Sequence, residues 1–290
     1  MQGPQEAQKV AREAQDKRLQ ERMGAITHKI LVMSGKGGVG KTTVAINLAL
    51  AIAMKGYSVG IMDTDLHGPN IAKMLGVQGE RLFSSAENTI EPFEVGSPLE
   101  GGAPIKAVSL ALSGNDDDEP VIWRGPIKIT VIKQFLADVN WGNLDFLIID
   151  SPPGTGDEPL TVVQSVPDLA GCVIVTTPQE VAILDSRKSI NFAKKTDAHV
   201  LGVVENMSGF KCPHCGDSID IFGKGGGEKA AKEMQVPFLG SIPLEKELMQ
   251  AEDAGRLFMK EFPDSESARA IMNITDKVLE AVRGALDEKK

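Results

Sequence analysis

Short runs of apolar, mostly β-branched residues recur along the chain and alternate with stretches of helical periodicity. The apolar runs that predict buried strands lie at 30–33, 59–62, 146–149, 173–176 and 200–204, with weaker candidates at 105–110 and 238–242. The stretches that predict helices lie at about 41–54, 126–138, 180–195, 226–234 and 265–286. This alternation is typical of a doubly wound, mostly parallel α/β sheet.

No internal repeat and no Pro/Gly-rich linker divides the chain, so we expect a single domain over residues 26–290. Residues 1–25 precede it as a charged arm, which is expected to be a solvated helix or a disordered segment. The acidic stretch 114–120 predicts an exposed loop. Near the C-terminus, apolar residues recur at close to helical spacing from 271 to 286, which indicates a helix packed on a core.

Composition and charge bear on the fold class, the expected partners and the location of the protein. Aromatic residues make up only 4% of the chain, which suits a parallel sheet buried on both faces better than a β-sandwich. The formal net charge is −9, from 31 basic and 40 acidic residues, so we expect neither nucleic acid nor a membrane as a partner. Residues 1–23 lack the apolar segment of a secretory signal, and the apolar run 45–54 is too short for a membrane span. These features favour a cytoplasmic protein.

The glycine-rich stretch between the first predicted strand and the first long helix has the spacing Gly-x4-Gly-Lys-Thr of a phosphate-binding loop. Such a loop turns backbone N–H groups toward phosphates, sets a lysine on the β- and γ-phosphate oxygens and a hydroxyl on Mg²⁺. The sequence therefore predicts an Mg-ATP site in which Lys41 is catalytic and Thr42 binds magnesium; a chance lysine after a glycine turn is the alternative. The other predicted nucleotide contacts in this stretch are Gly35, Gly37, Gly38, Val39, Gly40 and Thr43.

A second lysine, Lys36, directly follows the first glycine of the loop. In this form the loop resembles the deviant Walker A loop of the class that includes the nitrogenase iron protein and the MinD-like ATPases. The resemblance implies that Lys36 is catalytic and reaches across a dimer interface to the partner's nucleotide. A solvated loop lysine is the alternative.

Two acidic motifs follow predicted strands, at the end where an open α/β sheet binds its ligand. Asp150 comes directly after an apolar run and is expected to be the Walker B carboxylate, which holds Mg²⁺ or its water shell. Asp63 and Asp65 follow another run and are expected to form switch I, with Asp65 orienting the attacking water. A helix cap is the alternative for an Asp at a strand end.

Cys212 and Cys215 form a Cys-Pro-His-Cys-Gly knuckle within residues 210–217, whose two thiolates can bind one metal. Zinc or an iron–sulfur cluster needs four ligands, and a symmetric dimer would supply them from two copies of the knuckle. The alternatives are a redox pair of the thioredoxin kind and two incidental thiols. The third cysteine, Cys172, lies in an apolar run and is expected to be a buried core residue.

The order of the motifs carries a family resemblance. The deviant loop is followed by Asp-Thr-Asp-Leu-His-Gly-Pro-Asn at 63–70, Trp-Arg-Gly-Pro at 123–126, Asp-Ser-Pro-Pro-Gly-Thr-Gly-Asp at 150–157 and the knuckle. From about residue 28 to about 260 the chain resembles the Mrp/ApbC family of ATP-dependent iron–sulfur cluster carriers. The resemblance implies a homodimer that holds one [4Fe–4S] cluster between Cys212 and Cys215 of both subunits. From the ligand chemistry alone, zinc stays possible in its place.

The same resemblance implies that the cluster is delivered to apo iron–sulfur proteins. It also implies adenine contacts at Asn206, after the strand predicted at 200–204, and at Pro243 and Glu245, after the strand predicted at 238–242. A nickel-inserting or other metallocentre maturase would share the ATPase loop and the cysteines. A spatial regulator of the MinD or ParA kind would share the loop but has no use for the knuckle, and a small-molecule kinase is disfavoured by Lys36.

Overall fold

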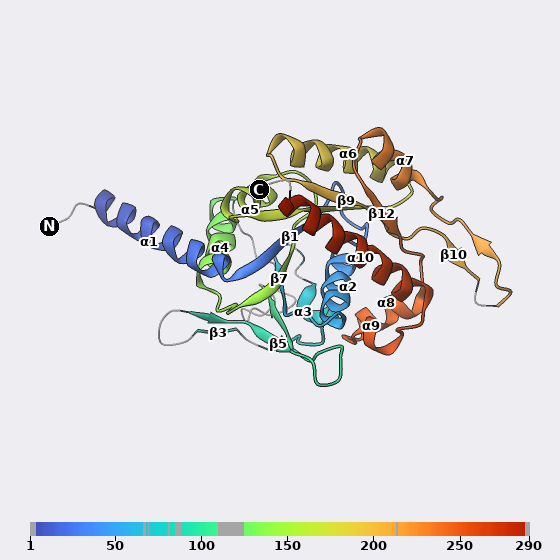
Figure 1. Cartoon of the computed structure of the whole chain (residues 1–290), viewed down its shortest axis with the longest axis horizontal. Coiled ribbons are helices and arrows are strands. Elements are labelled where there is room, and N and C mark those ends of the chain that lie inside the picture. Colours follow the sequence, from blue (N-terminus) through green and yellow to red (C-terminus); the bar gives the residue numbers. More distant parts are fainter. Residues whose placement is uncertain are drawn as a thin grey trace.

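The computed structural model describes residues 4–65, 68, 70–80, 82–84, 89–109, 125–212 and 214–287. Figure 1 shows a central sheet with helices on both faces and one N-terminal helix, α1 (Pro4–Gly24), that projects from the body. The predicted acidic loop at 114–120 lies outside the described residues. So do six residues of the motifs quoted above: Leu66, His67, Pro69, Trp123, Arg124 and Pro213.

The sheet has eight strands in the order β12-β9-β8-β1-β7-β2-β6-β5. All neighbouring pairs are parallel except the edge pair, in which β5 runs antiparallel to β6. The strands are β1 (Ile26–Ser34), β2 (Val59–Asp63), β5 (Phe93–Val95), β6 (Ile105–Val108), β7 (Leu144–Asp150), β8 (Leu169–Thr176), β9 (Val200–Glu205) and β12 (Phe238–Ser241). Two small antiparallel pairs lie outside this sheet: β3 (Phe83–Ser84) with β4 (Ile90–Glu91), and β10 (Phe210–Lys211) with β11 (Ser218–Ile219). The predicted fold class is confirmed.

Side chains of each strand alternate between two apolar clusters, one on each face of the sheet. In β1, Ile30 and Val32 belong to one cluster, whereas Leu31 and Met33 belong to the other. The first face carries α2 (Lys41–Met54), α3 (Ile71–Met74), α8 (Lys246–Asp253), α9 (Phe258–Glu261) and α10 (Glu266–Asp287). The second carries α1, α4 (Gly125–Asp138), α5 (Asp157–Ser165), α6 (Glu180–Lys195) and α7 (Gly226–Glu233). Burial on both faces explains why the strands read as nearly continuous apolar runs.

All seven predicted strands and all five predicted helices form. Strand β1 begins at Ile26 instead of residue 30, because the residues from Ile26 to Lys29 also pair with β7. The polar Lys29 is tolerated there because its buried ammonium donates hydrogen bonds to the carbonyls of Met23 and Ile26. The helices α3, α5, α8 and α9 were not predicted. They are four to nine residues long, so each offers few turns of helical period, although α7, which has eight residues, was predicted.

The N-terminal arm is helical, which decides between the two expectations for it. The exposed part of α1 points away from the body in Figure 1, but its last turns join the core, where Leu19 and Met23 are buried. Arg18 also pairs with Asp138 of α4 at 2.9 Å. None of the described helices is both long enough and apolar enough to cross a membrane.

Candidate functional site

The phosphate-binding loop connects the end of β1 at Ser34 to the start of α2 at Lys41. Gly38 and Gly40 have φ values of 79° and 77°, in the left-handed region that favours glycine. At Gly35 the constraint is space, because a Cβ there would lie 2.1 Å from the backbone of Asp185 in α6. The glycines at these three positions are therefore dictated by the backbone of the loop and by the helix packed against it.

Lys41 and Thr42 both converge on Asp150. The Lys41 ammonium lies 2.6 Å from Oδ1 of Asp150, and the Thr42 hydroxyl donates to Oδ2 at 2.7 Å. Asp150 is fully buried and Lys41 is only 6% exposed, so the pair is shielded from solvent. The three groups that a P-loop NTPase uses for phosphate and Mg²⁺ are thus gathered in one hydrogen-bonded cluster.

The switch aspartates differ in their surroundings. Asp63 at the end of β2 lies opposite Asp150 of β7 in the sheet register, and it accepts hydrogen bonds from the Asp65 N–H and the Ser109 hydroxyl, both at 3.0 Å. Burial, and then the charge of Asp150, raise the pKa of Asp63 to about 8. Asp65 is half-buried and lines the cavity over the phosphate-binding loop (the phosphate cavity). Asp65 therefore lies at the cavity and Asp63 does not line it, and the role of Asp65 in orienting a water stays a prediction.

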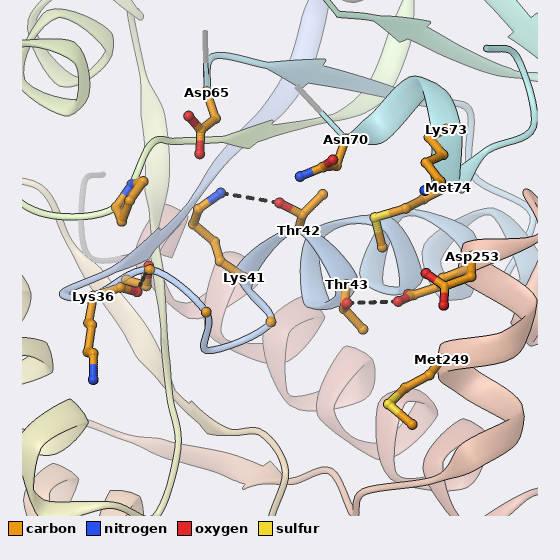
Figure 2. A pocket seen from close by; sticks show the side chains of 16 residues that line it. Lys36, Lys41, Thr42, Thr43, Asp65, Asn70, Lys73, Met74, Met249 and Asp253 are labelled. Atoms are coloured by element: carbon orange, nitrogen blue, oxygen red, sulfur yellow. Dashed lines mark hydrogen bonds between the residues drawn. The ribbon is translucent and has the colours of Figure 1, made fainter. Parts of the chain in front are cut away.

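A cavity of about 480 Å³ opens over the loop. Figure 2 shows Lys41 directed toward Asp65, while Lys36 points away from that ammonium on the other side of the loop. Lys36 is exposed. Sequence reasoning missed the residues that α3 and α8 contribute to the wall of this cavity: Lys73, Met74, Met249, Glu252 and Asp253. No motif marks them, because they reach the cavity only through helix packing.

The three predicted adenine contacts lie in two places. Asn206 follows β9 and is buried against the loop, where its amide donates to the Val39 carbonyl at 3.0 Å. Pro243 and Glu245 instead line a second cavity of about 440 Å³, together with Cys212. There the Glu245 carboxylate accepts a hydrogen bond from the Ser267 N–H at 2.9 Å. The structure therefore brings Asn206 to the phosphate-binding loop and Pro243 and Glu245 to the cysteine region.

The cysteine knuckle lies at the tip of the β10–β11 pair. The Cys212 N–H donates to the Asp217 carbonyl at 2.8 Å, and the N–H of Gly216, whose φ is 79°, donates to the Cys212 carbonyl at 2.9 Å. Cys212 is half-buried and Cys215 is exposed. The backbone N–H groups of Cys215 and His214 lower the pKa of Cys212, which favours the thiolate that binds metals.

The knuckle supplies fewer donors than a bound metal or cluster takes. Within the described part of the chain, no group of three or more His, Cys, Asp or Glu side chains is arranged to hold a metal ion. The knuckle offers two thiols, and a tetrahedral zinc or a cubane cluster takes four ligands. Cys172 plays no part in it: this residue is fully buried in β8, and burial raises its pKa to about 12, so the predicted core role is confirmed.

Residues 25–279 match the profile of the ParA family described as NUBPL iron-transfer P-loop NTPases. The chain belongs to this family. It is 48% identical over 270 residues to the iron-sulfur cluster carrier protein of Methanocaldococcus jannaschii, an alignment that covers 93% of this chain and 90% of the relative. It is 43% identical over 266 residues to the cytosolic Fe-S cluster assembly factor NUBP2 of Homo sapiens, covering 91% and 96% of the two chains. The resemblance to cluster carriers is thereby confirmed.

Solved structures of family relatives share the fold and hold nucleotides. A nucleotide-binding protein from Archaeoglobus fulgidus, solved in complex with ADP and with cobalt, superposes with a TM-score of 0.72 at 38% identity, over 87% of this chain and 98% of that one. The septum site-determining protein MinD of Pyrococcus horikoshii, solved with Mg-ADP, gives a TM-score of 0.60 at 25% identity, over 87% and 96%. The chain is accordingly a P-loop NTPase of the MinD/ParA type. The roles of individual site residues stay predictions.

A second glycine-rich loop, at residues 223–227, leads into α7 and lies at the end of β9. Its N–H groups at Gly225 and Gly227 donate to the buried carboxylate of Glu205 at 2.9 and 2.6 Å. The Ser208 hydroxyl donates to the same carboxylate at 2.6 Å. The loop is therefore satisfied by a side chain of its own protein. Sequence reasoning missed Glu205, which sits at the end of a buried apolar strand.

Proposed function

We propose that this chain is an Mg-ATP-hydrolysing carrier that holds a [4Fe–4S] cluster between two copies of itself and transfers it to apo iron–sulfur proteins. One observation carries the proposal: the chain combines a complete phosphate-binding cluster with an accessible pair of thiols that supplies half of a metal's ligands. Lys41, Thr42 and Asp150 converge within hydrogen-bonding distance, and Cys212 and Cys215 lie on a separate exposed hairpin. The human relative NUBP2 is named as a cytosolic assembly factor, which supports a cytoplasmic location for this chain.

The proposed hydrolysis follows from what each group can do. Lys41 neutralises the charge that develops on the transferred phosphoryl group, and Thr42 with Asp150 holds Mg²⁺ or its water shell. Asp65 orients the attacking water. Lys36, exposed and directed away from its own Lys41, would reach the nucleotide of the other subunit. Such an arrangement makes hydrolysis depend on the dimer.

The proposed cargo site follows from ligand number. Two knuckles related by a two-fold axis supply four thiolates, which is the set that a [4Fe–4S] cluster binds. Thiolate formation at Cys212 is favoured by its N–H neighbours. The same four thiolates would also suit zinc, which would then be an alternative occupant without redox chemistry.

A second candidate, an ATP-dependent maturase for another metal centre, is supported by the cobalt in the Archaeoglobus fulgidus relative. One experiment separates the two. The protein is reconstituted anaerobically with iron and sulfide, and in parallel with Ni²⁺ or Co²⁺, and metal content, Mössbauer spectra and sedimentation are measured. We expect about two iron atoms per chain, all in dimers, since one cubane is shared by two chains.

Cysteine variants complete this test. Cys212→Ala and Cys215→Ala should lose the iron completely, whereas Cys172→Ala, which changes a buried core residue, should keep it. A metal-loaded monomer with full stoichiometry would overturn the bridging arrangement. Tight binding of nickel or cobalt with no cubane spectrum would favour the maturase.

A further inference from the structure

Glu252 is a buried carboxylate that lines the phosphate cavity from the last turn of α8, with only 8% of the residue exposed. Burying a carboxylate is costly unless it is hydrogen-bonded. Here the Thr43 hydroxyl donates to Oε2 and the Asn47 amide donates to Oε1, both at 2.8 Å. Figure 2 shows the Thr43 hydroxyl directed toward α8. Both donors lie on α2, one turn apart, so Glu252 fastens α8 to the first turns of the phosphate-binding helix.

The same end of α8 touches the segment that follows switch I. Gly76, just after α3, and Gly255, just after α8, approach so closely that a Cβ on Gly76 would lie 2.4 Å from the Gly255 carbonyl oxygen. Both glycines have positive φ, at 72° and 65°. Backbone meets backbone at this contact, so a displacement of α3 would be transmitted to α8 directly.

The other end of α8 begins in the cysteine region. Leu244 forms a parallel bridge with Phe210 of β10, and its N–H donates to the Gly209 carbonyl at 2.8 Å. Glu245, the N-terminal cap residue of α8, lines the second cavity together with Cys212. A helix of eight residues is about 12 Å long, and α8 with its flanking residues joins these two contacts.

We propose that Glu252 is a positioning residue that couples the nucleotide site to the cysteine site within one subunit, with α8 as the connecting element. The inference rests on the proposed function, since it requires nucleotide at the loop and a metal at the knuckle. Nucleotide phosphates bind at the first turn of α2, to which Glu252 is hydrogen-bonded. A shift of this turn on binding is passed through α8 to the backbone beside Cys212. Coupling between two binding sites is reciprocal. Metal at the knuckle must therefore change the affinity for nucleotide by the same factor by which nucleotide changes the affinity for metal.

The experiment measures Mg-ADP dissociation constants by calorimetry for apo protein and for protein reconstituted with iron and sulfide. The coupling ratio is the quotient of the two constants, and a residue that merely stabilises the fold changes both constants without changing their quotient. We expect a ratio of about 5-fold or more in the wild type. In Glu252→Ala the ratio should fall to about 1. Gln250→Ala, an exposed position on the same helix, is the matched control and should keep the wild-type ratio.

A more conservative variant guards against loss of folding. Glu252→Gln keeps the shape and an acceptor oxygen for Asn47, so it should fold and show a ratio between those of wild type and Glu252→Ala. A wild-type ratio in both Glu252 variants would overturn the inference. A wild-type protein that binds Mg-ADP and iron with a ratio of 1 would also overturn it while leaving the proposed function intact. Failure to bind iron at Cys212 and Cys215, or to bind Mg-ADP at all, would instead defeat the proposed function and the inference with it.

Discussion

Two glycine-rich loops each open a helix in this fold, and their N–H groups meet different partners. The loop at 35–40 precedes α2 and faces a cavity of about 480 Å³. The loop at 223–227 precedes α7 and donates two N–H groups to the buried carboxylate of Glu205. A side chain of the same protein thus takes the place of the anion that such a loop can bind.

The comparison shows that glycines before a helix provide N–H donors without deciding what those donors bind. In the first loop, Lys41 and Thr42 follow the last glycine and converge on Asp150, which adds the positive charge and the hydroxyl that a nucleotide needs. In the second loop, the residues after the glycines are Glu228 and Lys229, both exposed. The presence of a built-in carboxylate is what separates a structural loop from a ligand site here.

The largest effect is expected when one lysine in each loop is replaced by alanine. Lys41→Ala should abolish ATP hydrolysis, because it removes the charge that stabilises the transferring phosphoryl group. Lys224→Ala, an exposed lysine in the second loop, should leave the rate unchanged. The measurement is phosphate release by the purified variants. Equal rates for wild type and Lys41→Ala would show that the first loop is not the hydrolytic site.

Within the first loop, Lys36 and Lys41 are expected to act on different nucleotides. Lys36→Ala should slow hydrolysis on the order of 100-fold, the usual effect of losing one stabilising donor. Mixing Lys36→Ala with Lys41→Ala should restore part of the activity, since a mixed dimer contains one site with both lysines. Phosphate release by the mixture, compared with each variant alone, checks this. No gain on mixing would mean that Lys36 acts within its own subunit.

In the second loop, removal of the carboxylate should cost stability. Glu205→Ala leaves the part-buried N–H of Gly225 and the buried N–H of Gly227 without an acceptor, and should lower the free energy of unfolding by about 2–4 kcal/mol. Glu205→Gln keeps one acceptor oxygen and should lose less. Urea unfolding with matched m-values measures both changes. A loss below about 0.5 kcal/mol in Glu205→Ala would show that the loop does not depend on its carboxylate.

A pH-dependent effect is expected at Asp63, the buried carboxylate near the first loop. Burial, followed by the charge of Asp150, raises the pKa of Asp63 from 3.8 to about 8, so between these values the folded protein keeps a proton that the unfolded chain has released. Stability from this group is therefore complete below about pH 4 and is lost as the pH rises to about 8. Asp63→Asn should gain stability relative to wild type between about pH 6 and pH 8. Urea unfolding across this range tests it, with Asp65→Asn as the half-buried control; parallel curves for Asp63→Asn and wild type would contradict the assignment.

Much of this protein was determined by local sequence pattern. The apolar runs predicted every long strand of the sheet, because strands covered by helices on both faces are mostly apolar. The loop at 35–42 and the knuckle at 212–215 could be predicted because their chemistry depends on residues a few positions apart, where spacing alone sets the geometry. The same reasoning placed Asp150 and Asp63 at strand ends, although not the register that sets them side by side.

Only the tertiary structure decided which distant groups meet. The Thr43–Glu252 hydrogen bond joins residues that are 209 positions apart. The sequence pattern of a helix as short as α8 does not predict it. In the sequence, Glu205 is only the last residue of an apolar run. The structure shows that the loop at 223–227 covers it and donates two hydrogen bonds to it. In both cases a polar side chain is buried, and its partner is set by strand order and helix packing. A carboxylate must find donors wherever it is buried, and only the folded chain determines which donors are within reach.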